Sequence, residues 1–137
     1  MDNYKNRVTA IALGLALAWV SVVIAGFGAA VSIPAEILYP VAQLSGLLAF
    51  TLIDLFTIAI PLAAAFLAFA FFSRLAIKRP DTVFYVLLLA PLVLLHLYFL
   101  VQAQSQMLDM MVMTLPRHLL LVVCFFFLVR NATSANV

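Results

Sequence analysis

The sequence predicts an all-α membrane protein with four transmembrane helices in an up-down bundle and an extra interfacial or re-entrant helical segment before the second span. Of its 137 residues, 68% are hydrophobic and only 9% are charged. An ordinary soluble domain has about half apolar and about a quarter charged residues. The apolar residues also form runs long enough for a helix to cross the bilayer core, which takes about 20 residues. We therefore expect a single integral membrane domain over residues 1–137, with the lipid bilayer as its first partner.

The four spans are expected at residues 8–31, 51–73, 82–102 and 110–129. The first is uncharged and follows Lys5 and Arg7. The second apolar stretch begins at Val41 and is too long for one upright helix. Residues 33–49 are therefore expected to form the interfacial or re-entrant segment, with Pro34 near its start.

Positive charge orients these spans. With four spans, all but Arg117 of the Lys and Arg residues fall on one side, as the positive-inside rule requires: Lys5, Arg7, Arg74, Lys78, Arg79 and Arg130. A fifth span over residues 33–50 would export the cluster at residues 74–79. We therefore expect a multi-pass protein of a cell inner membrane with both termini cytoplasmic. A cleaved signal peptide is the alternative for the first span, but its apolar core is longer than that of usual signal peptides.

The composition excludes several classes of function. Cys124 is the only cysteine, so neither an intramolecular disulfide nor a cysteine-based zinc site can form. The basic residues are scattered over the ends of segments and make no nucleic-acid-binding patch. No phosphate-binding loop, metalloprotease or nucleophile-elbow motif occurs. We expect no catalytic residues, no resident metal and no cofactor.

Small residues mark a candidate helix-packing face on the first span. Ala10, Gly14 and Ala18 recur at four-residue spacing, and Ala25 continues the face. Small residues let helix backbones approach closely in lipid, where the hydrophobic effect does not drive association. The alternative is that alanine is simply common in spans. A weaker stripe of the same kind, Ala64 and Ala68, lies in the second span.

Ionisable residues inside spans form the second candidate feature. Asp54, His96, Arg117 and His118 all fall in the half of the bundle away from the basic ends. A charge in a span is costly unless it pairs or reaches water, so we expect Asp54 and Arg117 to pair, with a histidine adding hydrogen bonds. This polar cluster is then either a clasp between the second, third and fourth spans or a pathway for a proton or substrate. The remaining alternative is that Arg117 snorkels to the headgroups.

Methionines gather before and at the start of the last span: Met107, Met110, Met111 and Met113. Thioethers and imidazole suit Cu(I), and the four-residue spacing of Met107 and Met111 stacks them on one helix face. The alternative is that these methionines are ordinary apolar filler.

These features favour a non-enzymatic membrane protein that acts as an accessory or assembly subunit of a membrane complex, or as a homo-oligomer. Its expected partners are another membrane protein or a second copy of itself. The alternative is a compact transporter or channel for a proton or small ion, with Cu(I) as one candidate, using the polar cluster. An enzyme is disfavoured because no nucleophile and base, and no paired carboxylates, are placed for chemistry.

Overall fold

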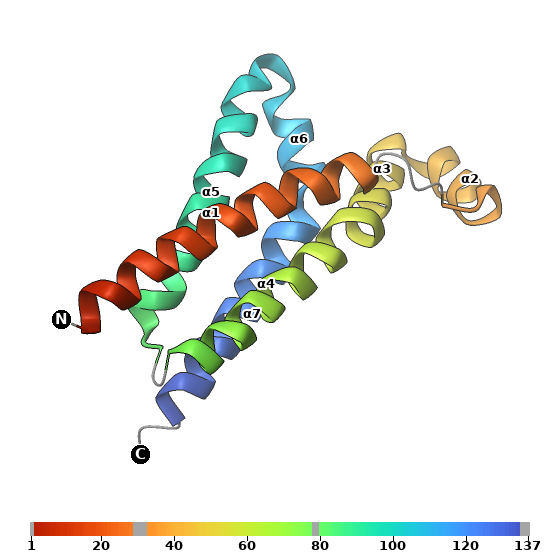
Figure 1. Ribbon diagram of the computed structural model, residues 1–137. Coiled ribbons are helices and arrows are strands. Elements are labelled where there is room, and N and C mark those ends of the chain that lie inside the picture. Colours follow the sequence, from red (N-terminus) through yellow and green to blue (C-terminus); the bar gives the residue numbers. More distant parts are fainter. Residues whose placement is uncertain (1, 29–32, 78–79, 135–137) are drawn as a thin grey trace.

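The computed structural model describes residues 2–28, 33–77 and 80–134, and over these residues the chain is helical with no strand (Figure 1). Among them, four helices are long and apolar enough to cross a membrane: Tyr4–Gly28, Gly46–Leu75, Thr82–Gln102 and Leu115–Ala132. The all-helical class and the four membrane-spanning helices expected from the sequence are thus confirmed.

The first span is α1 (Asp2–Gly28), which packs most extensively against α5 (Thr82–Gln102). The helix starts before the expected span at residue 8 because the polar residues ahead of it continue the helix. Residues 29–31, the expected end of this span, lie outside the described residues. The third span matches its expected boundaries of 82–102, and Asp81 caps it by accepting a hydrogen bond from Phe84 N–H at 2.8 Å.

The second span begins earlier than residue 51. A short helix, α2 (Ala35–Leu44), is followed at Ser45 by a break in extended conformation, and α3 (Gly46–Asp54) then continues without interruption into the long helix. Residues 46–49, expected in the interfacial segment, therefore belong to the span. The Ser45 hydroxyl oxygen accepts a hydrogen bond from Leu48 N–H, which explains why the new helix starts here. No residue of α2 is buried, and Figure 1 shows α2 at one end of the molecule.

A π-helical turn, η1 (Leu55–Ala59), joins α3 to α4 (Ile60–Ala76). Pro61 has no N–H, and its ring crowds the carbonyl four residues earlier, so a regular α-helix is disfavoured here. The helix widens instead, with the Ile60 N–H bonded to the Leu55 carbonyl and the Thr57 hydroxyl donating to the Ile53 carbonyl at 2.8 Å. Asp54 is the last residue before this widened turn.

The last span is not the single helix expected at 110–129. After α5, a 3₁₀ turn η2 (Gln104–Gln106) leads into α6 (Met107–Met113), and α7 (Leu115–Ser134) follows a break at Thr114. Pro116 accounts for the break because it cannot donate a hydrogen bond to the carbonyl four residues earlier. The Thr114 hydroxyl donates to the Met110 carbonyl at 2.7 Å. The chain reverses before α6 at Gln104, whose φ of 46° lies in the left-handed region.

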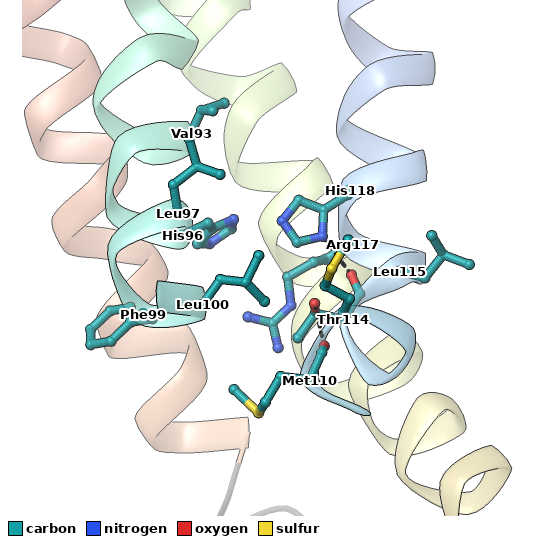
Figure 2. A pocket seen from close by; sticks show the side chains of 11 residues that line it. Val93, His96, Leu97, Phe99, Leu100, Met110, Thr114, Leu115, Arg117 and His118 are labelled. Carbon is teal, nitrogen blue, oxygen red and sulfur yellow. Dashed lines mark hydrogen bonds between the residues drawn. The ribbon is translucent and has the colours of Figure 1, made fainter. Parts of the chain in front are cut away.

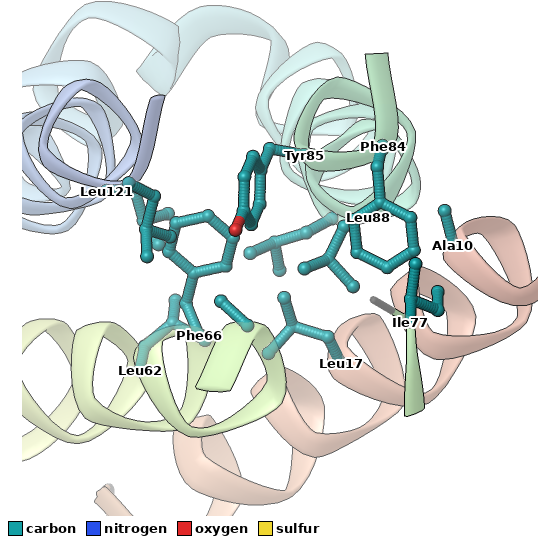
Figure 3. Packing of buried hydrophobic residues seen from close by; sticks show 12 residues of the cluster. Ala10, Leu17, Leu62, Phe66, Ile77, Phe84, Tyr85, Leu88 and Leu121 are labelled. Carbon is teal, nitrogen blue, oxygen red and sulfur yellow. The ribbon is translucent and has the colours of Figure 1, made fainter. Parts of the chain in front are cut away.

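The core lies where α1, α4, α5 and α7 meet (Figure 3). Phe66 of α4, Leu17 of α1 and Tyr85 of α5 are fully buried there. At the edge of this core, Arg74 Nε donates a hydrogen bond to the Tyr85 hydroxyl at 2.9 Å. Two side chains thus connect the end of α4 to the start of α5.

The small-residue face of α1 packs inside the chain. A Cβ added at Gly14 would lie 2.6 Å from the Leu88 carbonyl oxygen and 2.9 Å from the Pro91 ring, so α1 approaches α5 as closely as only glycine permits. Ala10 and Ala18 are buried beside it, and Ala25 is half-buried at the edge of the face. The weaker small-residue stripe of α4 is not covered in this way, because Ala64 and Ala68 are exposed.

Candidate functional site

The polar residues singled out in the spans converge where α3, α5 and α7 pass one another. Asp54 ends α3, His96 lies on α5 about 9 Å before its end at 1.5 Å per residue, and Arg117 and His118 lie in the first turn of α7. The structure brings all four residues into one region, in two pairs: Asp54 with Arg117, and His96 with His118.

Asp54 and Arg117 form a bidentate ion pair. Arg117 Nε donates to one carboxylate oxygen of Asp54 at 3.2 Å, and Nη2 donates to the other. The side chains are 8% and 15% exposed, so water contributes little to either charge. The planar guanidinium matches the two carboxylate oxygens, and such charge-assisted pairs are stronger than neutral hydrogen bonds. The pair therefore ties the second span to the last one and cancels both charges locally.

The two histidines bring their rings together from α5 and α7, edge to face (Figure 2). Their ring centroids lie 5.2 Å apart and their planes meet at 80°. His118 Nδ1 lies 2.8 Å from the Thr114 carbonyl oxygen. A carbonyl only accepts, so Nδ1 carries a proton here, and in the neutral tautomer that fits this contact Nε2 is the acceptor. The break before α7 thus fixes the orientation of the His118 ring.

His96 Nδ1 is buried and has no hydrogen-bond partner among the described residues. An unsatisfied buried polar atom is uncommon in folded proteins, and it costs roughly 1–3 kcal/mol. The atom therefore calls for a partner that the described part of the chain does not supply.

A cavity of about 310 Å³ opens beside these rings. Its walls come from α5, α6 and α7 and are mostly apolar, with His96, Thr114, Arg117 and His118 as the polar contributors (Figure 2). The apolar wall consists of Val93, Leu97, Phe99, Leu100, Met110, Met111 and Leu115. Asp54 does not line the cavity itself, but it is paired with Arg117, which does. The cavity is therefore an apolar pocket with little polar surface.

The methionine cluster divides. Met110 and Met111 line the cavity, whereas Met107 and Met113 do not. Figure 2 shows Met110 on the far side of Arg117 from the two imidazoles. Within the described part of the chain, no three His, Cys, Asp or Glu side chains lie close enough together to hold a metal ion. The described geometry thus separates one of the cavity-lining thioethers from the imidazoles.

Two irregular turns shape the site, and both lie at prolines inside the spans. The π-helical turn after Asp54 precedes Pro61, and the break at Thr114 precedes Pro116. An internal proline removes a backbone hydrogen bond, so the sequence itself predicts a kink at each position. Which residues line the cavity could not be predicted, since its walls come from three separate helices.

Comparison with protein-family models, with curated proteins and with solved structures finds no match to this chain. The function is therefore inferred from the arrangement of the side chains themselves. They can hold spans together through the ion pair, and two imidazole rings line a mostly apolar cavity.

Proposed function

We propose that this chain is a non-enzymatic accessory or assembly subunit of a membrane complex, or a homo-oligomer, that associates with its partner through the outer face of α4. The observation that carries this proposal is the outward position of Ala64 and Ala68. These residues belong to a row at four-residue spacing in which Ile60 and Phe72 are 46% and 66% exposed. The side chains of this row are small in the middle and large at both ends, so they leave a shallow groove into which a partner helix can pack.

The contrast with α1 supports this role for α4. On α1 the small residues are covered by α5, and Gly14 permits the closest approach. On α4 no helix of the described chain covers the second small stripe, since both alanines are exposed. Because lipid chains fill a groove between side chains less well than a complementary helix does, small-residue stripes favour helix association in membranes.

The ion pair supports a structural role for the polar residues. Arg117 and Asp54 satisfy one another with two hydrogen bonds. Between Asp54 and Arg74, the next charged residue along the second span, the sequence contains no ionisable side chain. A proton relay needs a succession of such groups across the membrane. The pair is therefore better suited to holding α3 and α7 together than to passing a proton.

The topology that we propose is an up-down bundle with both termini on the cytoplasmic side of an inner membrane and α2 lying in the opposite interface. Its support is the distribution of charge. Arg7 lies near the start of α1, and Arg74 and Arg130 lie near the ends of α4 and α7, so an up-down arrangement puts all three on the same side of the membrane. Figure 1 shows the start of α1 and the end of α7 toward the same side of the molecule, which is in keeping with this arrangement. Tyr39 and Leu44 of α2 are 67% and 83% exposed, as expected of a helix that lies against lipid headgroups and acyl chains.

Purification of the tagged protein from its native membrane in mild detergent tests the proposal. We expect a stoichiometric partner, or a defined homo-oligomer, that is lost when Ala64 and Ala68 are both replaced by leucine. The matched control is Ala16→Leu, the same enlargement on the exposed side of α1. A wild-type protein that is a partner-free monomer, or an assembly that survives the Ala64→Leu, Ala68→Leu double change, would refute the proposal.

A compact transporter is the second candidate, and the cavity lined by His96, Arg117 and His118 favours it. On this hypothesis Asp54→Asn abolishes flux into proteoliposomes while the protein still folds. On the accessory-subunit hypothesis the same change lowers yield and stability, and wild-type protein shows no flux of protons or small ions to lose.

A further inference from the structure

The unpartnered nitrogen of His96 and the cavity beside it point to a ligand. The cavity of about 310 Å³ has the volume of about ten water molecules at roughly 30 Å³ each. Its size is at the lower end of small-molecule sites, which span about 300–1,000 Å³. Such a volume accepts one substituted six-membered ring but not a large headgroup.

The apolar and the polar side chains that line the cavity indicate different parts of this ligand. Leu97, Leu100 and Leu115 are among the apolar side chains of the wall. The imidazoles of His96 and His118 both line the cavity. His96 Nδ1 is buried and has no partner among the described residues, and the contact of His118 Nδ1 with the Thr114 carbonyl leaves Nε2 as the acceptor of a neutral His118 ring. A neutral imidazole donates or accepts according to its tautomer. The ligand therefore combines an apolar body with carbonyl or hydroxyl oxygens.

Charge argues against an anionic ligand. Among the described residues that line the cavity, Arg117 is the one cation, and its guanidinium is already paired with the Asp54 carboxylate. A phosphate would have to compete with that pair in a site that excludes most water. An uncharged headgroup avoids this cost.

We propose that the cavity between α5, α6 and α7 binds the ring headgroup of a neutral membrane amphiphile of the quinone or quinol class, with its oxygen atoms on His96 and His118. The ligand ring has the two imidazoles on one side and Leu97, Leu100 and Leu115 on the other. The apolar tail leaves through the open side of the cavity into the bilayer. This proposal is independent of the partner surface on α4, because the two sites share no residue.

Binding of a benzoquinone with a ten-carbon tail to the purified full chain in detergent tests this assignment. We expect saturable binding of one probe per chain. His96→Phe keeps a ring but removes both nitrogens and should weaken binding at least tenfold, whereas His96→Gln, which retains a donor and an acceptor, should recover part of the loss. Tyr98→Phe, which removes a hydroxyl from an exposed side chain on the same helix, should leave binding within threefold.

A second pair of variants tests the cavity without changing a polar group. Leu97→Trp fills the cavity and should abolish saturable binding, whereas Leu94→Trp places the same ring on a side chain that is 66% exposed and does not line the cavity. Circular dichroism and size-exclusion chromatography establish that each variant is folded, and the leucine pair decides the outcome if His96→Phe does not fold.

Four results would overturn the assignment. The first is the absence of saturable binding to the wild-type chain. The second is unchanged affinity in both His96→Phe and Leu97→Trp. The third is displacement of the probe by phosphatidylglycerol at equal concentration, which would assign the cavity to an anionic lipid. The fourth is binding of Cu(I) through both histidines without any binding of the quinone, which would assign it to a soft metal.

Discussion

Removal of one partner of the Asp54–Arg117 ion pair should destabilise the protein far more than removal of both. Asp54→Leu leaves the Arg117 guanidinium in a site where the side chain is 15% exposed, without its carboxylate. Loss of one partner from a buried pair costs roughly 3–5 kcal/mol, whereas replacement of both by apolar residues is often neutral. We therefore expect about 3–5 kcal/mol of destabilisation from Asp54→Leu, a similar loss from Arg117→Leu, and at most about 1 kcal/mol from the double variant.

Reversible unfolding by sodium dodecyl sulfate in mixed micelles, followed by circular dichroism, measures these free energies. The double-mutant cycle then gives a coupling energy of at least about 5 kcal/mol, which is more than a thousandfold in the unfolding equilibrium. Lys5→Gln and Glu36→Gln change exposed charges and should stay within about 0.5 kcal/mol of wild type. If the two single losses simply add in the double variant, the ion pair does not hold α3 to α7.

Two further substitutions test the packing of the spans by the same unfolding assay. Gly14→Ala puts a Cβ 2.6 Å from the Leu88 carbonyl oxygen, and we expect a loss of about 1–3 kcal/mol because backbone and a proline ring cannot move aside easily. Gly26→Ala is the matched control, since nothing lies within 4 Å of its added Cβ, and it should range from no change to about 1 kcal/mol more stable. Equal effects of the two glycine changes would contradict the close approach of α1 to α5. Tyr85→Phe removes the acceptor of Arg74 Nε at 2.9 Å and should cost about 1 kcal/mol, because the exposed guanidinium regains water. A Tyr85→Phe protein as stable as wild type would show that this hydrogen bond does not fasten α4 to α5.

The number of spans could be predicted from the sequence because each depends on a local property. Length and hydropathy alone place the third span at residues 82–102, and the helix there has those bounds. Two of the boundaries that differed lie beside a proline or a serine. Pro116 divides the last helix, and Ser45 moves the start of the second span to Gly46. A hydrogen bond that Pro116 cannot donate divides the last helix, and one that the Ser45 hydroxyl accepts starts the second span. Hydropathy reports neither of these hydrogen bonds.

The meeting of Asp54 and Arg117 could be anticipated from the cost of a lone charge in lipid. Each residue needs a partner, and few are within reach at the same depth. The two small-residue stripes show the limit of such reasoning. Gly14 and Ala64 belong to similar sequence patterns, yet the first is covered by α5 and the second is exposed. Which stripe is covered depends on how the helices are rotated about their axes.

The sequence by itself thus determined the membrane environment, the helical class and the need for Asp54 and Arg117 to find partners, because these depend on composition and on the solvation of single groups. Only the tertiary structure decided that His96 packs against His118 beside a cavity and that its Nδ1 has no partner among the described residues. A cavity is the space left between side chains of helices that are distant in the chain, so its existence depends on their packing and not on any one segment.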